Sequence, residues 1–308
     1  MKIVFMGNPE FAVPSLKKLA ASNHEILSVV TNPPKPAGRG RKLINTPVAK
    51  CAEDLDLNVM EIDNLHSEKT IQNLQKLNAD VFTVVAYRIL PKEIIAIPAM
   101  GSINLHGSLL PKYRGAAPIQ WSLINGDRET GLTTFILQDK VDTGNVLQQK
   151  KISIDQDDNY GSLSKKMSNA GAELLFETMD EFEKGNLDPY AQDDFKATIA
   201  RKISAEMTVI NWQKSAQEIH NLIRGLTPSP GVRTLLSGKG LKIFETEFIK
   251  ENSALNKGEI SKIEKEYFSI QTSTGQLIVL QVQLEGKRRM SAGDFLRGVQ
   301  LEVGTCLG

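Results

Sequence analysis

The 308-residue chain is poor in several residue types, and each shortage excludes a class of protein. It has two cysteines, Cys51 and Cys306, and neither belongs to a C-x-x-C pair. We therefore expect neither a disulfide framework nor a zinc site, and interpret both as inert thiols. The longest apolar stretches, such as 81–86, fall far short of the roughly 18 residues that a membrane-spanning helix needs. A formal charge of only +1 at first argues against a nucleic-acid partner, because phosphate binding usually requires a basic excess.

The composition that remains, 41% hydrophobic and 24% charged, is typical of a soluble globular chain of one or two domains. The apolar run 2–7 is followed directly by Asn8-Pro9-Glu10, and no small-residue cleavage site closes it. This pattern favours a first strand over a secretory signal. We therefore expect a cytoplasmic protein that enters no membrane and needs no obligate protein partner.

Over residues 1–188, β-branched apolar runs alternate with longer amphipathic segments. This rhythm predicts an α/β fold, a Rossmann-like and mostly parallel sheet. Strands are expected at 2–7, 25–31, 59–62, 80–87, 101–108 and 131–138, and helices at 9–22, 47–56, 67–78, 115–125 and 160–185. Because 80–87 is apolar on both faces, we expect it in the centre of the sheet.

Residues 189–206 have no sustained period and predict a linker between a domain at 1–188 and a smaller one at 207–308. In the second domain a helix is expected at 215–226, followed by short strands at 232–236, 241–249, 258–263, 267–272 and 276–284. Five strands in about 55 residues favour a small β-barrel of the oligonucleotide-binding (OB-like) type. Such a fold does not by itself define a function.

Polar residues gather at the end of one predicted strand. Asn104 and His106 are two positions apart and should project from the same face, at the edge where open α/β sheets bind ligands. Asp142 follows the next predicted strand and could orient His106, with Asp139 as its rival. The alternatives are a satisfied core histidine, a strand-end amide and a turn-forming aspartate.

The motif around these residues is long enough to resemble a known family. The run Asn104-Leu-His-Gly-Ser-Leu-Leu-Pro-Lys-Tyr-Arg-Gly-Ala-Ala-Pro-Ile119, together with Val141-Asp-Thr-Gly144, resembles the signature of the folate-dependent formyltransferases. Four further stretches resemble the branch of that family that formylates methionine carried by initiator tRNA: Phe5-Met-Gly-Asn-Pro-Glu-Phe11, Asn32-Pro-Pro-Lys-Pro-Ala-Gly-Arg-Gly-Arg-Lys42, Ile210-Asn-Trp212 and Gly286-Lys-Arg-Arg-Met-Ser-Ala292. The resemblance covers essentially the whole chain.

The resemblance implies catalytic roles for three residues. The donor would be 10-formyltetrahydrofolate, the acceptor the α-amino group of methionyl initiator tRNA, and no metal would take part. Asn104 would donate to the oxyanion of a tetrahedral intermediate. His106 would also stabilise that oxyanion or accept the amine proton, while Asp142 sets its tautomer and charge.

The resemblance also implies a folate site on two segments. The main chain at Arg88, Ile89 and Leu90 would bind the pterin, together with Ser108, Leu109, Leu110 and Pro111. The run Tyr87-Arg-Ile-Leu-Pro91 is one residue shorter than in many tRNA-directed members and is similar to that of glycinamide ribonucleotide formyltransferases. The Arg88 side chain would either extend into solvent or contact the ligand.

A basic loop is the expected tRNA contact. The run Asn32-Pro-Pro-Lys-Pro-Ala-Gly-Arg-Gly-Arg-Lys42 carries Lys35, Arg39, Arg41 and Lys42. Such a cluster is often only a solvated surface. In the resembling enzymes an inserted loop grips the acceptor stem, which implies that role here, with Arg39 as the matching arginine.

The near-zero net charge conceals an uneven distribution. Residues 1–188 hold 21 Lys and Arg against 23 Asp and Glu, a net −2. Residues 189–308 hold the remaining 16 and 13, a net +3, and together these recover the totals of 37 and 36. Local basic patches therefore remain compatible with an RNA substrate held moderately and in a salt-sensitive way.

Other functions remain open alternatives. Formyl transfer to a small amine such as an amino nucleotide sugar or glycinamide ribonucleotide, and hydrolysis of formyl-folate, would use the same three residues. An NAD-dependent oxidoreductase is disfavoured because Asn8-Pro9-Glu10 follows Gly7 where G-x-G-x-x-G needs more glycines. A non-catalytic RNA-binding module would leave the Asn/His/Asp set unexplained. The remaining histidines and both tryptophans are interpreted as structural or solvated: His24, His66, His220, Trp121 and Trp212.

Overall fold

A computed structural model describes residues 1–37 and 42–308. The chain forms two compact units, each assembled from separate stretches of sequence. Unit 1 comprises Met1–Ala116, Thr130–Ser153 and Ser164–Ala200, and unit 2 comprises Ala117–Glu129, Ile154–Leu163 and Arg201–Gly308.

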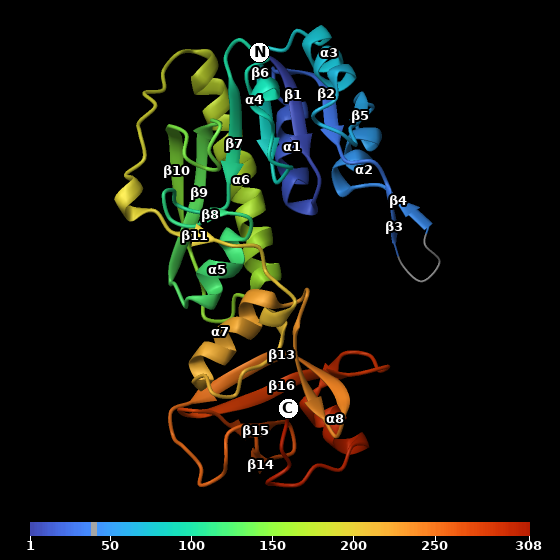
Figure 1. Cartoon of the computed structure of the whole chain (residues 1–308), viewed down its shortest axis with the longest axis vertical. Helices are drawn as coiled ribbons and strands as arrows, with labels where there is room; N and C mark the ends of the chain where they lie inside the picture. Colours follow the sequence, from blue (N-terminus) through green and yellow to red (C-terminus); the bar gives the residue numbers. More distant parts are fainter. Residues whose placement is uncertain (38–41) are drawn as a thin grey trace. The chain divides into compact units, whose positions relative to one another are not determined.

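Unit 1 is built on a seven-stranded sheet with the order β10-β9-β7-β6-β1-β2-β5 (Figure 1). Its strands are β1 (Lys2–Gly7), β2 (Glu25–Thr31), β5 (Val59–Glu61), β6 (Val81–Val85), β7 (Ser102–His106), β9 (Glu129–Ile136) and β10 (Val146–Ser153). β5, β2, β1, β6 and β7 run parallel, whereas β9 is antiparallel to β7. The predicted Rossmann-like sheet is thus confirmed, and the fully buried β6 lies at its centre, as expected.

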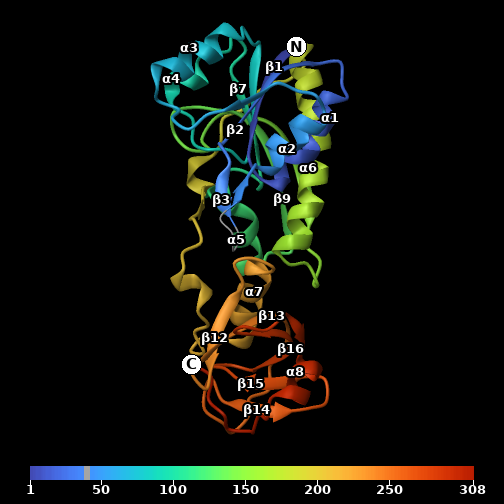
Figure 2. The same cartoon turned by 90° about the vertical axis from the view of Figure 1, so that its right-hand side faces the viewer.

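Helices cover both faces of this sheet. In Figure 2, α3 and α4 lie on one side of the strands and α1 and α6 on the other. Their bounds, with that of α2, are α1 (Val13–Ala20), α2 (Pro47–Asp54), α3 (Glu68–Lys76), α4 (Lys92–Ile95) and α6 (Tyr160–Glu183). The side facing α3 and α4 buries Val4, Met6, Phe82 and Val84. Because helices cover both faces, side chains on either side of a strand are buried. The sequences of these strands are therefore nearly continuous apolar runs, without alternating polar residues.

Unit 2 contains an antiparallel sheet with the order β12-β13-β16-β15-β14, and β17 pairs with β16. Its elements are α5 (Pro118–Ile124), the 3-10 helix η3 (Glu206–Thr208), α7 (Ala216–Leu226), β12 (Val232–Leu236), β13 (Lys239–Ile249), β14 (Ile260–Ile263), β15 (Phe268–Gln271), β16 (Gln276–Leu284), β17 (Met290–Ser291) and α8 (Ala292–Gly298). The five predicted strands are present.

The expected closed OB-like barrel is not confirmed. Over the described residues the sheet path stays open between β12 and β14. Only isolated bridges link the C-terminal segment to these edges, Leu236 to Leu307 and Glu259 to Cys306. Strand number and length predicted a barrel, but closure depends on pairing across the last edge, which strand patterns do not encode.

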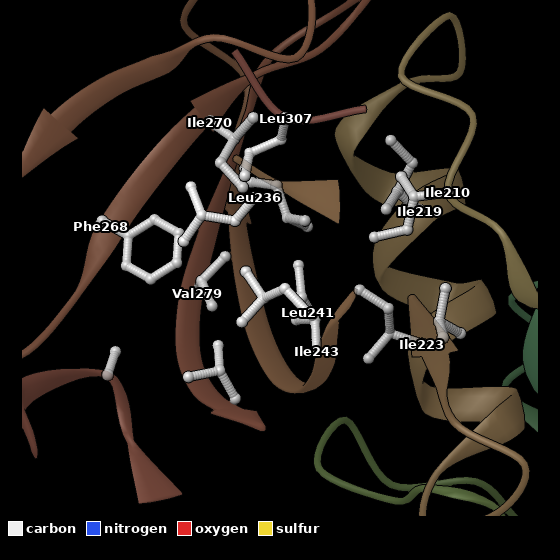
Figure 3. Close-up of a cluster of buried hydrophobic side chains, with 14 of the residues drawn as sticks. Ile210, Ile219, Ile223, Leu236, Leu241, Ile243, Phe268, Ile270, Val279 and Leu307 are labelled. Atoms are coloured by element: carbon white, nitrogen blue, oxygen red, sulfur yellow. The ribbon is translucent and has the colours of Figure 1, made fainter. Parts of the chain in front are cut away.

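The core of unit 2 lies between this sheet and α7. Figure 3 shows Leu241, Ile243 and Val279 from the strands facing Ile219 and Ile223 from α7. The register of α7 is fixed at its start by a capping box, in which Ser215 and Glu218 bond reciprocally to each other's backbone N–H. Trp212 belongs to the same core and is buried, as expected for a packing residue.

Several short elements were not predicted. They are the hairpin β3 (Lys35–Ala37) and β4 (Lys42–Ile44), the parallel pair β8 (Arg114–Gly115) and β11 (Ile199–Ala200), the strands β10 and β17, the helices α4 and α8, and the 3-10 helices η2 (Asp194–Lys196) and η3. The predicted helix at 9–22 begins with a 3-10 turn, η1 (Glu10–Ala12). No helix among residues 1–37 and 42–308 is long and apolar enough to cross a membrane.

Candidate active site

The predicted pair Asn104 and His106 lies on β7, between β6 and β9 in the sheet. Two positions apart on a strand, their side chains leave the same face. His106 is buried, with 6% of its surface exposed. Asn104 is partly exposed, and within the described chain its amide makes no hydrogen bond. The amide is therefore available to an external acceptor.

The imidazole of His106 has a defined orientation. Its Nε2 lies 2.9 Å from the carbonyl oxygen of Tyr113. A carbonyl oxygen only accepts hydrogen bonds, so Nε2 carries a proton and donates it there. The other nitrogen, Nδ1, faces Oδ2 of Asp142 at 3.7 Å. Nδ1 is thus the nitrogen left to exchange a proton.

Asp142 is held beside this nitrogen by the main chain of the motif. Its Oδ2 accepts a hydrogen bond of 2.7 Å from the backbone N–H of Gly115. The residue has φ +54°, in the left-handed region, which costs roughly 1 kcal/mol or more for a non-glycine residue. Asp139, the rival at sequence level, is exposed. The geometry places Asp142, not Asp139, next to His106.

The chain reaches this arrangement by a route that differs from the expected one. We expected neighbouring strands to end at one edge, but β9 is antiparallel to β7, with Ile136 opposite Ile103. The segment 137–145 between β9 and β10 folds back and carries Asp142 to His106. Gly144 lies against β9, where an added Cβ would come within 1.7 Å of the carbonyl oxygen of Ile136. Only glycine allows this close approach.

A distant segment fixes the loop that follows β7. Thr198 accepts a 2.8 Å bond from Tyr113 N–H through its hydroxyl and a 2.8 Å bond from Arg114 N–H through its carbonyl. β11 then pairs in parallel with β8, matching Ala200 to Gly115. The segment expected to be a plain linker therefore orients two backbone groups of this loop, the Tyr113 carbonyl that contacts His106 and the Gly115 N–H that contacts Asp142.

The same segment contributes a glutamine that the sequence analysis missed. Gln192 donates from Nε2 to the carbonyl oxygens of Asp142, at 3.0 Å, and Gly144, at 2.8 Å. Its Oε1 accepts from Arg114. No local motif marks Gln192, because its partners lie 48 to 78 residues away in sequence.

The second predicted folate segment, Ser108 to Pro111, has much of its main chain bonded internally. Thr133 Oγ1 donates to Ser108 O at 2.7 Å and accepts from Leu110 N at 3.1 Å. Gln149 donates to Leu110 O at 2.8 Å. Leu109 O accepts from Lys112 N, and Pro111 O accepts from Thr198 N. This segment is a rigid wall whose polar groups are largely satisfied.

The first predicted folate segment is different. Within the described residues, the backbone groups of Arg88, Ile89 and Leu90 form no hydrogen bonds, and the side chain of Ile89 is 75% exposed. The Arg88 guanidinium donates to the carbonyls of Ile62 and Asp63 and to the hydroxyl of Tyr87. The side chain is therefore not a free solvated cation, because it anchors the segment to the residues that follow β5. A contact with the ligand stays a prediction.

The predicted tRNA contacts are only partly described. Lys35 and Lys42 are exposed on the β3–β4 hairpin, whereas Arg39 and Arg41 lie outside the described residues.

Among the described residues no cluster of three His, Cys, Asp or Glu side chains could hold a metal ion. His24 and His106 are buried, while His66 is exposed.

Comparison with known proteins decides the family. Residues 1–179 match the family model for formyl transferase, and residues 202–300 match that for the formyl transferase C-terminal domain. The chain belongs to the formyltransferase family. This formyltransferase is 43% identical to the methionyl-tRNA formyltransferase of Caldanaerobacter subterraneus subsp. tengcongensis and 40% identical to that of Clostridioides difficile, with 100% of each chain covered.

Solved structures share the fold at lower identity. An N-formyltransferase from Helicobacter canadensis, in complex with folinic acid and dTDP-3-aminofucose, gives a TM-score of 0.69 at 19% identity, covering 94% of this formyltransferase and 100% of that chain. HypX from Aquifex aeolicus, in complex with tetrahydrofolic acid, gives 0.64 at 17% identity, covering 97% and 48%. At these identities the likeness shows the fold alone.

Proposed function

We propose that this formyltransferase transfers the formyl group of 10-formyltetrahydrofolate to the α-amino group of methionyl initiator tRNA. The observation that carries the proposal is identity of 40% or more along the whole chain with methionyl-tRNA formyltransferases. Formyl transfer to an amino nucleotide sugar is the alternative. It fits less well, because the sugar formyltransferases of known structure share only the fold.

The folate donor would bind along residues 88–90. Unpaired backbone N–H and C=O groups at Arg88, Ile89 and Leu90 can form the paired hydrogen bonds that a pterin ring requires. The Arg88 guanidinium fixes this segment by donating hydrogen bonds to the Ile62 and Asp63 carbonyls. Ser108, Leu109, Leu110 and Pro111 would supply shape and apolar contact more than hydrogen bonds.

The catalytic residues would act on a neutral amine attacking the formyl carbon. The tetrahedral intermediate carries an oxyanion and a protonated nitrogen. Asn104, whose amide makes no hydrogen bond within the described chain, would donate to the oxyanion, a contribution of about 10²–10³-fold.

Proton transfer would pass through Nδ1 of His106, since Nε2 is engaged by Tyr113. The amine loses one proton, and N10 of the folate gains one as its bond to the formyl carbon breaks. Asp142 would stabilise the charged imidazole during this exchange, which requires the 3.7 Å approach seen between the two side chains.

The acceptor would be bound outside this chemistry. Lys35, Arg39, Arg41 and Lys42 form the basic loop, and residues 189–308 carry a net +3. We infer a catalytic domain at 1–188, a linker at 189–206 whose first part also bonds to the loops around the site, and a tRNA-binding domain at 207–308 in a cytoplasmic enzyme. Basic side chains would bind phosphates and so position the tRNA, whereas the methionine that the tRNA carries would enter the Asn104–His106–Asp142 site.

The test is formylation of charged initiator tRNA by wild-type protein and by Asp142→Asn. Wild type should give formylmethionyl-tRNA that depends on formyl-folate. Asp142→Asn is nearly isosteric and should lower kcat by about 10²–10⁴-fold while its KM for tRNA stays close to wild type. A wild type without transfer to the tRNA would refute the function, and an unimpaired variant would refute the residue assignment.

A further inference from the structure

Gln192 occupies an unusual place for a residue of a connecting segment. It lies between the loop that carries Asp142 and the guanidinium of Arg114, and it bonds to both. We propose that Gln192 is a positioning residue for the formyl-transfer reaction, holding the 142–144 loop so that Asp142 faces His106. This inference rests on the function proposed above.

The hydrogen-bond inventory of the amide fixes its orientation. Both N–H groups of Nε2 have carbonyl acceptors, Asp142 O at 3.0 Å and Gly144 O at 2.8 Å. Oε1 accepts from Arg114 Nε at 3.1 Å and from Nη2 at 2.7 Å. A flipped amide would set an oxygen against two carbonyls and N–H groups against a cation. One orientation is therefore strongly favoured.

Besides Gln192, the loop is held by hydrogen bonds from Gly115 N–H to Asp142, from Thr143 Oγ1 to Lys140 O and from Ile136 N to Asn145 O. Its tip is polar or exposed, with Asp139 and Lys140 exposed and Val141 46% exposed. Asp142 itself adopts a left-handed φ of +54°, which must be maintained by its surroundings. Side-chain burial therefore contributes little, and hydrogen bonds to the main chain fix where the carboxylate points.

Arg114, which donates to Gln192, is itself fixed in position. It is buried, with 8% of its surface exposed, and its Nη2 forms an ion pair of 2.7 Å with Asp194. Its backbone N–H is tied to Thr198, so the guanidinium starts from a fixed main chain. The arrangement runs from Arg114 through Gln192 to Asp142, and each link uses groups with fixed geometry.

The discriminating variant is Gln192→Leu, which keeps the size and removes the amide. Loss of the loop's anchor should lower kcat on charged tRNA by about 10²-fold, because small misplacements of catalytic groups have effects of that size. KM values for folate and tRNA should change little, and the pH dependence of kcat should shift. Gln75→Leu, the same change at an exposed position of α3, should match wild type in all three.

A double-mutant cycle separates positioning from general damage. If Gln192 acts through Asp142, then Gln192→Leu should lower kcat less than about 3-fold once Asp142 is already Asn. Additive losses in the two backgrounds would overturn the proposal. Gln192→Glu provides a second variant that retains the contact with Arg114 but cannot donate to the two carbonyls, and it should show the same non-additivity.

The outcomes distinguish this inference from the proposed function. If wild type formylates the tRNA and Gln192→Leu matches it, positioning is refuted while the function stands. If wild type transfers no formyl group to the tRNA, the function itself is refuted, and this inference with it. A Gln192→Glu that matches wild type also refutes positioning, whether or not Gln192→Leu folds.

Discussion

At the scale of single residues, the site combines one amide without a partner in the described chain with one fully oriented imidazole. His106 has Nε2 committed to Tyr113 and Nδ1 turned to Asp142, so its protonation chemistry is confined to one nitrogen. Asn104 on the same strand face retains both amide N–H groups. In the proposed reaction the two side chains would therefore have separate tasks, charge stabilisation by the amide and proton exchange by the imidazole.

We predict that Asn104→Asp, which keeps the shape but replaces the donor by a carboxylate, lowers kcat by at least about 10²-fold. The carboxylate would repel the developing oxyanion instead of stabilising it. Steady-state kinetics with charged tRNA should show KM values within a few-fold of wild type. Asn58→Asp, at an exposed residue just before β5, is the matched control. A rate near wild type for Asn104→Asp would contradict the assignment.

The sequence predicted these residues because they lie within short motifs. The runs 104–119 and 141–144, which contain Asn104, His106 and Asp142, are long enough to be recognised as a family motif. The buried strand β6 could be predicted from its apolar pattern. Gln192 and Thr198 could not be found in this way, since a lone glutamine or threonine in an aperiodic stretch carries no local signal. Their roles arise from pairing across about 50 to 85 residues, as in Tyr113 N–H to Thr198.

At the scale of elements, unit 2 depends on close packing between α5 and α7. A Cβ added at Gly225 of α7 would lie 2.6 Å from Ile124 Cγ1 and 3.0 Å from the carbonyl oxygen of Gln120, both on α5. Side-chain periodicity predicted α7 with nearly the observed bounds, but which face lies against α5 was not visible in it. The absence of a side chain at Gly225 allows the two helices to approach.

We predict that Gly225→Ala lowers the free energy of unfolding by about 1–3 kcal/mol through overpacking. Gly298→Ala is the matched control, because a Cβ at Gly298 of α8 meets no atom within 4 Å. That control should be neutral or slightly stabilising, since alanine is the better helix former. Urea unfolding of both variants measures the difference, and equal stabilities would contradict the packing argument.

The contact between α7 and β13 predicts a pH dependence. Burial lowers the pKa of His220 to about 4, the charge of Arg224 acts in the same direction, and the bond to Thr246 opposes it. Between about pH 4 and 6.5, His220 is therefore protonated in the unfolded chain but neutral in the folded protein. The stabilising contribution is present above pH 6.5 and is lost as the pH falls towards 4, by roughly 3 kcal/mol at about 1.4 kcal/mol per pKa unit.

We therefore expect His220→Gln to unfold with a flatter pH dependence than wild type over this window. The glutamine keeps a polar group beside Thr246 but does not titrate. Denaturant unfolding at several pH values between 4 and 7.5 measures the slope. His66→Gln, at an exposed histidine, should leave the slope unchanged, and a His220→Gln slope equal to wild type would refute the explanation.

At the scale of the whole molecule, the charge distribution matches a large anionic substrate held locally. The net −2 of residues 1–188 and +3 of 189–308 nearly cancel, although Lys35 and Lys42 expose positive charge on the β3–β4 hairpin. A few phosphate contacts release few counterions, so binding should be moderate and reversible. Product release would then be compatible with repeated turnover.

We predict that raising KCl from about 50 mM to about 200 mM increases KM for charged tRNA while KM for formyl-folate changes much less. Arg39→Ala should raise the KM for tRNA. It should also lower the slope of log KM against log salt concentration by about 1, the value for one phosphate contact. Steady-state kinetics at four salt concentrations gives both slopes. A tRNA KM that is insensitive to salt, or unchanged in Arg39→Ala, would contradict binding through this loop.

The most direct test of the account is a competition between two acceptors for one donor. Wild-type protein receives 10-formyltetrahydrofolate together with charged initiator tRNA and a dTDP-linked amino sugar, and each formylated product is quantified over time. The account predicts that formyl appears on the methionyl α-amino group, with kcat/KM at least about 10³-fold above that of the sugar. Preferential formylation of the sugar, or release of free formate without transfer to the tRNA, would contradict it.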